Sequence, residues 1–234
     1  MKKLIKLFLC IALMLVSVYL IHYYYTEIEP KNNKEIVDSK DKMESISDLR
    51  EKYDNNEIVM SFEIPDLITL PIVQTENNDY YLSHDLHKKE NNVGTPFLDY
   101  RIRSLNDKKV IIYGYNDVDS TLPFSALTSY KDESFYKTHP VILVNSNEGK
   151  RRYEIFSCFV DDKNFNYDVL NVFNNTKYEE QLKLLKDKSD YDTAVSVNRD
   201  DRILILLTGT LNESKDSLKY QFVVAKENNS VVNK

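Results

Sequence analysis

The chain has 234 residues, of which 42% are hydrophobic and 29% are charged, an ordinary composition for a globular protein. This length suffices for one sizeable domain and an additional segment. The formal net charge of -6 argues against a nucleic-acid-binding surface, because binding to phosphates requires a basic face.

The N-terminal segment is the most hydrophobic part of the chain. Lys2, Lys3 and Lys6 precede an uncharged stretch from Leu7 to Tyr25, and a stretch of roughly 19 residues spans a bilayer as a helix. The basic residues predict a cytoplasmic N-terminus and an extracellular remainder, at the cell membrane. A cleaved signal peptide is the alternative, but bulky residues follow the apolar core where a cleavage site needs small ones. We therefore expect a membrane anchor in residues 1–25, inserted through residues 4–25.

Residues 26–54 are expected to link this anchor to the folded domain. The first part, up to Lys42, is polar and contains Pro30, as is typical of a linker. From Met43 to Tyr53 the apolar residues fall at helical spacing, which predicts a short amphipathic helix.

Residues 55–230 are mostly strand-like. In Ile58–Ile64, for example, apolar side chains alternate with the period of a half-buried strand. The strands expected after it are Ile68–Gln74, Lys109–Tyr113, Val141–Val144, Arg152–Val160, Thr193–Val197, Ile203–Thr208 and Tyr220–Ala225. Helical pieces are expected at Phe124–Tyr130 and Lys177–Lys188. Eight short strands with few helices predict a mainly β fold, a largely antiparallel barrel or sandwich.

The cysteines and histidines give little sign of a metal or cofactor. Cys10 lies in the expected anchor, so Cys158 is the only thiol outside it and no internal disulfide is expected there. His84 and His87 share a polar stretch, but a metal site would need a third ligand, so we interpret both as exposed loop residues. His139 precedes a proline at the start of a strand and is interpreted as structural.

Five pieces in a fixed order carry a resemblance to a known family. They are NDYYLSHDL (Asn78–Leu86), VGTPFLDYR (Val93–Arg101), VIIYGYN (Val110–Asn116), PFSALTSYKDESFYKTHPVI (Pro123–Ile142) and RILILLTGT (Arg202–Thr210). Together they resemble the class B sortases, membrane-anchored cysteine transpeptidases of Gram-positive bacteria. The resemblance covers about Glu57 to Lys226 and implies an eight-stranded β-barrel. It also implies an enzyme that cuts a sorting signal after a threonine, forms a thioester on a cysteine, and transfers the acyl group to a cell-wall amine.

The residues at the family's catalytic positions differ from those the chemistry needs. The cysteine of the nucleophile strand aligns with Gly209, which has no nucleophile, and the histidine aligns with Tyr115. A phenol with a pKa of about 10 is a poor base at neutral pH. Counting back from Ala225 places Tyr220 at the arginine position, with Lys219 as the alternative; a lysine lacks the planar fork of arginine.

Other residues at family positions are unchanged. The resemblance places Asn78, Leu82, Leu207 and Thr208 near the substrate groove, which agrees with retained peptide binding and equally with maintenance of the fold.

Two hypotheses about function follow, with a third possibility. The first is a catalytically inactive, sortase-like surface protein that binds a sorting-signal-like peptide or a partner protein. The second is an active transpeptidase or peptidase with an unrecognised nucleophile, for which Cys158, Thr208 and Thr210 are the obvious residues. A copy that is decaying and has no present function is the third.

Overall fold

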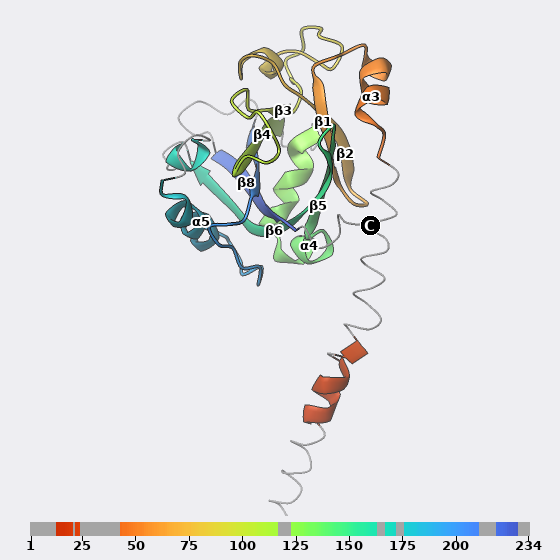
Figure 1. Ribbon diagram of the computed structural model, residues 1–234. Helices are drawn as coiled ribbons and strands as arrows, with labels where there is room; N and C mark the ends of the chain where they lie inside the picture. Colours follow the sequence, from red (N-terminus) through yellow and green to blue (C-terminus); the bar gives the residue numbers. More distant parts are fainter. Residues whose placement is uncertain are drawn as a thin grey trace, which may run out of the picture. The chain divides into compact units, whose positions relative to one another are not determined.

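A computed structural model describes residues 13–20, 22–23, 43–116, 123–162, 167–171, 176–210 and 219–228 (Figure 1). The chain divides into two units, Met1–Met43 and Glu44–Lys234. Residues 13–20 and 22–23 of the first unit are helical, and no helix within the described residues is both long and apolar enough to cross a membrane. Most of the expected anchor, and linker residues 26–42, lie outside the described residues, so the anchor stays a prediction.

The described part of the second unit forms a closed eight-stranded barrel, as the sequence predicts. The strands are β1 (Ile58–Ile64), β2 (Ile68–Val73), β3 (Phe97–Leu98), β4 (Lys109–Asn116), β5 (Val141–Ser146), β6 (Gly149–Asp162), β7 (Ile203–Thr210) and β8 (Lys219–Glu227). Around the barrel they follow the order β1-β2-β3-β4-β7-β8-β6-β5, and β5 pairs with β1 to close it. The pairs β2·β3 and β4·β7 are parallel and the others are antiparallel, so the sheet is mixed.

The apolar run of β7 is explained by burial on both faces of the sheet. Leu204 and Leu206 point into the barrel interior, where they join Phe62, Val110 and other buried side chains. Their neighbours Ile203, Ile205 and Leu207 point outward into a second buried cluster. A central strand covered on both faces reads as a continuous hydrophobic run because neither face needs polar side chains.

Short helices cover the barrel and fill its interior. The helix α5 (Tyr178–Asp187) buries Tyr178, Leu182 and Leu185 in the outer cluster, and it matches the expected helix Lys177–Lys188. The 3-10 helix η3 (Pro123–Lys131) places Phe124, Leu127 and Tyr130 in the interior cluster. It lies where Phe124–Tyr130 was expected to be helical. The short helix α4 (Glu133–Thr138) follows it and was not expected from the sequence.

The helix α3 (Ile46–Tyr53) begins three residues later than expected and packs on the barrel. The Ser45 hydroxyl accepts a hydrogen bond from the Asp48 N–H (3.1 Å), which caps the first turn. Ile46 and Leu49 are buried with Ile58 of β1 and Val73 of β2. The helix therefore belongs to the barrel unit, which has its own closed sheet and hydrophobic cores and is expected to fold without residues 1–43.

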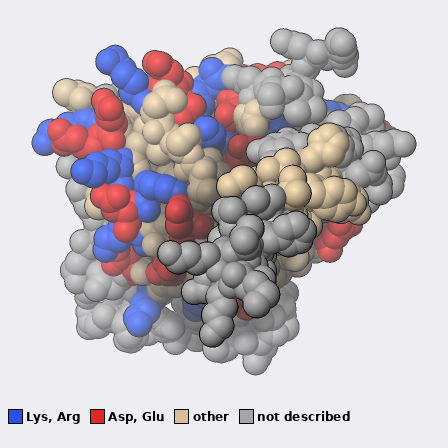
Figure 2. All heavy atoms as spheres, turned by 90° about the horizontal axis from the view of Figure 1, so that it is seen from below, with Lys and Arg blue, Asp and Glu red and all other residues tan. Residues whose placement is uncertain are grey.

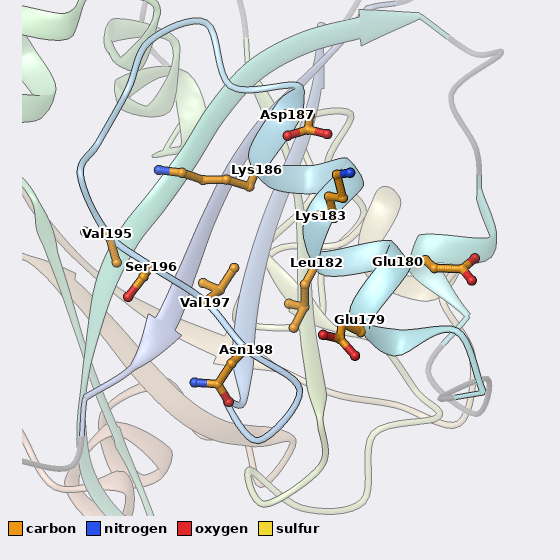
Figure 3. A pocket seen from close by; sticks show the side chains of 10 residues that line it. All are labelled: Glu179, Glu180, Leu182, Lys183, Lys186, Asp187, Val195, Ser196, Val197 and Asn198. Atoms are coloured by element: carbon orange, nitrogen blue, oxygen red, sulfur yellow. The ribbon is translucent and has the colours of Figure 1, made fainter.

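The strand expected at Thr193–Val197 is wrong. The Thr193 hydroxyl donates a hydrogen bond to the Phe156 carbonyl (2.9 Å), but Ala194 has a φ of 56°, a left-handed conformation that interrupts an extended strand. The chain then runs alongside α5, where Val195, Val197 and Leu182 help to line a cavity of about 440 Å³ (Figure 3). Val195 and Val197 alternate with polar residues because they lie on the side of this segment that faces α5, and not because the segment is a strand of the sheet.

The eighth strand is β3 instead, and the sequence analysis missed it. Its two residues, Phe97 and Leu98, are buried and lie between β2 and β4. A two-residue strand shows no alternation, so a pattern of period two cannot reveal it.

Charged side chains of both signs are mixed on the surface seen from below. On this face the blue Lys and Arg residues alternate with red Asp and Glu residues, and the described residues form no patch of one sign there (Figure 2). Mixed charges of this kind give the described part of that face no field of one sign that would attract a polyanion.

Candidate functional site

A cavity of about 380 Å³ lies where β4, β7 and β8 approach their shared end. The first segment that lines it is the region of η2 (Tyr80–Leu82), which contributes Asn78 and Leu82. The strands contribute the rest of the lining, namely Phe97, Tyr113, Gly114, Tyr115, Leu207, Gly209 and Tyr220. The cavity thus gathers six of the seven residues singled out from the sequence.

The three residues that the sequence resemblance aligns with the family's catalytic positions are direct neighbours across three strands. In the parallel pair β4·β7, Tyr115 is opposite Gly209, and in the antiparallel pair β7·β8, Gly209 is opposite Tyr220. Side chains at directly opposed positions of adjacent strands share one face of the sheet. Tyr115 and Tyr220 therefore flank Gly209 on the face that carries the cavity.

Tyr220 and Lys219 point in opposite directions. Tyr220 lines the cavity, whereas the exposed Lys219 is the next residue along the strand and so faces the other side of the sheet. Of the two alternatives considered for the arginine position, Tyr220 is the one whose side chain reaches the cavity.

Thr208 lies between two lining residues of β7 and is not in the lining itself. It is fully buried and its strand partners are Gly114 and Gln221. The alternation of a strand explains this, because Leu207 and Gly209 face the cavity and Thr208 faces the opposite side. A hydroxyl in that position is shielded from any ligand of the cavity.

A buried carboxylate supports one wall of the cavity, and the sequence analysis missed it. The Asp99 side chain is fully buried and pairs with Arg101, with 2.7 Å between Oδ2 and Nη2 and 2.9 Å between Oδ1 and Nε. Two cavity residues also donate to Oδ2, the Tyr113 hydroxyl at 3.0 Å and the Asn78 amide at 3.2 Å. Asn78 Oδ1 accepts a hydrogen bond from the Tyr100 N–H (2.9 Å), which fixes the amide at both ends.

The surroundings of Asp99 stabilise the ionised form of its carboxyl group. Burial favours the neutral acid, but hydrogen bonds from Arg101 and its positive charge outweigh that effect and hold the pKa of the Asp99 carboxyl below its ordinary value. Burial and the neighbouring carboxylate raise the pKa of Tyr113. Asp99 is thus an anchor for Tyr113 and Asn78, and its own oxygens are occupied.

Tyr115 is a neutral phenol at physiological pH. Burial raises the pKa of Tyr115 above the ordinary value of a tyrosine, so even less of it is ionised to the phenolate that could accept a proton. The described lining also includes no cysteine, histidine, lysine or arginine. These side chains offer neither a thiolate nor a base of suitable pKa for acyl transfer.

Gly114, between the cavity residues Tyr113 and Tyr115, has a packing role. A Cβ atom at this position would approach the ring of Phe124 to 2.5 Å, too close for any side chain. The glycine allows the interior helix η3 to pack directly against β4.

The alternative nucleophile Cys158 lies in the barrel interior. It is fully buried among apolar side chains, and burial raises the pKa of its thiol to about 12. The expectation that it is an inert core residue agrees with this position. The side chain of Thr210 lies outside the described residues.

The histidines His84, His87 and His139 lie outside the cavity lining. His87 is exposed as expected, but His84 is half-buried and not exposed. His84 stacks on Tyr80 with 3.9 Å between ring centroids, and its Nδ1 lies 2.7 Å from the Tyr80 carbonyl. His87 packs near Tyr53, and His139 ends α4 and stacks on Phe135. Within the described residues, no group of three His, Cys, Asp or Glu side chains is arranged to hold a metal ion.

No family model matches the chain, but curated relatives do. It is 34% identical over 158 residues to sortase B of Listeria monocytogenes, and 31% identical over 143 residues to sortase B of Staphylococcus aureus. These matches cover 67% and 60% of this chain, and 63% and 58% of the two relatives, so the matched part spans less than two thirds of their length.

The chain is also similar to solved structures of sortase B, and these matches cover more of the chain than the curated relatives do. The chain is similar to the Staphylococcus aureus sortase B-substrate complex with a TM-score of 0.71 and 26% identity, covering 85% of this chain and 94% of that one. For sortase B from Listeria monocytogenes the TM-score is 0.65 with 30% identity, covering 76% and 98%. For Clostridium perfringens sortase B it is 0.69 with 26% identity, covering 79% and 100%.

Proposed function

The chain belongs to the class B sortase family, and from that premise we propose that it is an inactive member that binds peptides at the cell surface. Its ligand is a sorting-signal-like peptide or an extended segment of a partner protein. Residues 1–25 hold it in the membrane with the barrel outside the cell. The proposal is based on three side-by-side residues of β4, β7 and β8 in the wall of an open cavity, namely Tyr115, Gly209 and Tyr220. We call these three residues the row.

The chemistry of the row favours binding without turnover. Acyl transfer through a thioester needs a thiolate, a base and a group that stabilises the oxyanion. A glycine between two tyrosines supplies neither of the first two. Of the alternative nucleophiles, Cys158 and Thr208 are both buried away from the cavity.

The remaining walls favour a peptide as the ligand. Leu82 and Leu207 provide apolar surface, and Asp99 holds Asn78 and Tyr113 in fixed orientations. A pocket with mostly apolar walls and a few fixed polar groups is typical of ligand sites. The similar Staphylococcus aureus structure is a complex with a substrate, which makes a peptide of that kind the first ligand to test.

An NMR titration tests binding and turnover in one sample. We expect a sorting-signal peptide, added with an amine acceptor to isotope-labelled residues 44–234, to shift resonances of Leu82, Leu207 and Tyr220. No resonances of a cleaved or transferred peptide are expected over days, because no residue of the cavity attacks it. Cleavage or transfer of the peptide would establish the alternative, an active enzyme.

A matched pair of lysine variants separates specific binding from surface adsorption. Leu82→Lys places a charge in the cavity wall and is expected to weaken peptide binding by about tenfold, which corresponds to about 1.4 kcal/mol. Leu67→Lys makes the same change at a residue that is already 37% exposed, near the turn between β1 and β2, and is expected to bind as the wild type does. Equal affinities for the two variants would rule out this cavity as the peptide site.

A further inference from the structure

Two consecutive rows of side chains cross β4, β7 and β8 on the face of the cavity. The first row is Tyr113, Leu207 and Phe222, and the second is Tyr115, Gly209 and Tyr220. Both rows have aromatic residues at the outer positions. In the first row Leu207 is only 5% exposed and occupies the middle. In the second row the middle position is Gly209, which has no side chain and is part of the cavity lining.

The spacing of the strands fits a flat group between the two phenols. Adjacent strands lie about 4.8 Å apart, so the backbones of Tyr115 and Tyr220 are separated by roughly 9.6 Å across Gly209. A planar ring in contact with a ring on either side needs about 3.5–4 Å to each, or roughly 7–8 Å in total. The separation of the two strands that carry Tyr115 and Tyr220 therefore leaves room for one aromatic ring between two others.

The surroundings favour a neutral ligand over a cation or a sugar. Both oxygens of Asp99, the nearest buried carboxylate, already accept hydrogen bonds from Arg101, and the described lining contains no charged side chain. A sugar would need partners for several hydroxyl groups, but the Asn78 amide is held by Asp99 and Tyr100. The nearest walls, Leu82 and Leu207, are apolar.

We propose that Tyr115, Gly209 and Tyr220 form an aromatic slot that binds the neutral aromatic side chain of a peptide ligand. The inference rests on the proposed function, since it specifies which residue of the bound peptide this cavity selects. Aromatic rings stacked in this way gain more than their buried area alone provides. Gly209 is then a binding residue by virtue of its missing side chain.

Saturation-transfer NMR on residues 44–234 tests the slot with two probes of similar size. We expect N-acetylphenylalaninamide to receive saturation at its ring protons and to bind about three- to tenfold more tightly than N-acetylcyclohexylalaninamide. The variant Gly209→Leu makes the second row like the first and is expected to abolish the signal. Its amide spectrum and thermal midpoint should remain those of a folded barrel, because leucine is better suited to a strand than glycine.

A tyrosine pair serves as the control for aromatic content. Tyr220→Leu removes one wall of the slot and is expected to weaken binding of the phenylalanine probe about tenfold or more. Tyr53→Leu changes a half-buried tyrosine of α3 that is outside the lining, and it should have no effect. Equal binding of the aromatic and cyclohexyl probes, or unchanged binding in Gly209→Leu, would overturn the slot. So would displacement of the probe by an N-acetylglucosamine disaccharide.

The slot and the proposed function fail in different ways. If the sorting-signal peptide shifts Leu82 and Leu207 but the aromatic probe does not bind, peptide binding stands and the slot is wrong. If the aromatic probe binds wild type and not Gly209→Leu, while the sorting-signal peptide leaves the spectrum unchanged, the slot stands and its ligand is a different peptide.

Discussion

The thiol of Cys158 lies in the barrel interior, next to residues of η3 and β8 in the same cluster. Because burial raises its pKa to about 12, the fraction present as thiolate at pH 8 is roughly one in ten thousand. Thiolate, and not thiol, reacts with disulfide reagents. We expect Cys158 of residues 44–234 to be unreactive toward Ellman's reagent at pH 8 until the protein is unfolded.

The control for this measurement is an exposed thiol on the same chain. Ser196→Cys adds one in the exposed segment beside α5, and it should react within minutes while Cys158 stays protected. Rapid reaction of Cys158 in the folded wild type would mean that the interior opens readily, and would bring this residue back as a candidate nucleophile.

Gly209 illustrates what the sequence reveals about the site and what it leaves out. The ordered motifs indicate that positions 115, 209 and 220 belong together, and the register of β4, β7 and β8 places them side by side. The motifs do not reveal Asp99, Phe97 or Tyr113, because these residues meet through the pairing of β3 with β4. Such a pairing depends on the three-dimensional fold and has no local pattern.

At the scale of the elements, Asp99 joins the short strand β3 to its surroundings. It follows Leu98 directly, and it bonds to Tyr113 of β4 and to Asn78 near η2. Removing one partner of a buried ion pair leaves the other uncompensated. We expect Asp99→Ala to lower the free energy of unfolding by about 3 kcal/mol, measured by urea denaturation at pH 7.

An exposed ion pair provides the matched control for Asp99. Glu133 and Lys137 of α4 are bonded at 2.8 Å with side chains that are 47% and 64% exposed, so Glu133→Ala should cost less than about 0.5 kcal/mol. If Asp99→Ala cost no more than Glu133→Ala, the carboxylate would not be the anchor of this wall.

The pH dependence of Asp99 has a defined sign. Its pKa is lower in the folded protein than in the unfolded chain, so its stabilisation is present above the ordinary pKa of about 3.9 and is lost as the pH falls through the lower, folded value. The stability difference between the wild type and Asp99→Ala should therefore be constant near neutrality and shrink below about pH 4.

The elements predicted from sequence were those with a long pattern. The alternation in β1 and the apolar runs of β4 and β7 identify these strands because each pattern extends over six or more residues. The strand β1 was expected to be half-buried, but it is almost entirely buried, including Ser61 and Glu63. Thr193–Val197 has the same alternation, but Ala194 and the packing against α5 keep it out of the sheet. The parallel pairing of β4 with β7 is also invisible locally, because both strands are covered on two faces by segments distant in the sequence.

At the scale of the whole molecule, the proposed function assigns different tasks to the two units. The barrel unit contains every described strand and its own hydrophobic cores, so its stability is expected to be independent of residues 1–43. We propose that the apolar segment after Lys6 retains the domain at the membrane. A surface with both charge signs gives the barrel little attraction of its own to an anionic membrane on the face in Figure 2.

Deleting residues 1–25 separates these tasks. In a Gram-positive host we expect the full chain to sediment with membranes and to resist extraction by high salt and alkaline carbonate, since a spanning helix is held by hydrophobic burial and not by charge. The deleted chain should appear in the soluble fraction with the same urea midpoint as the barrel of the full chain. Protease added to intact cells should digest the barrel of the full chain, because the lysines before the apolar segment keep the N-terminus inside. Release of the full chain by salt would contradict the anchor. Protection of the barrel from protease until the cells are lysed would contradict the orientation, and the cavity would then have no access to ligands outside the cell.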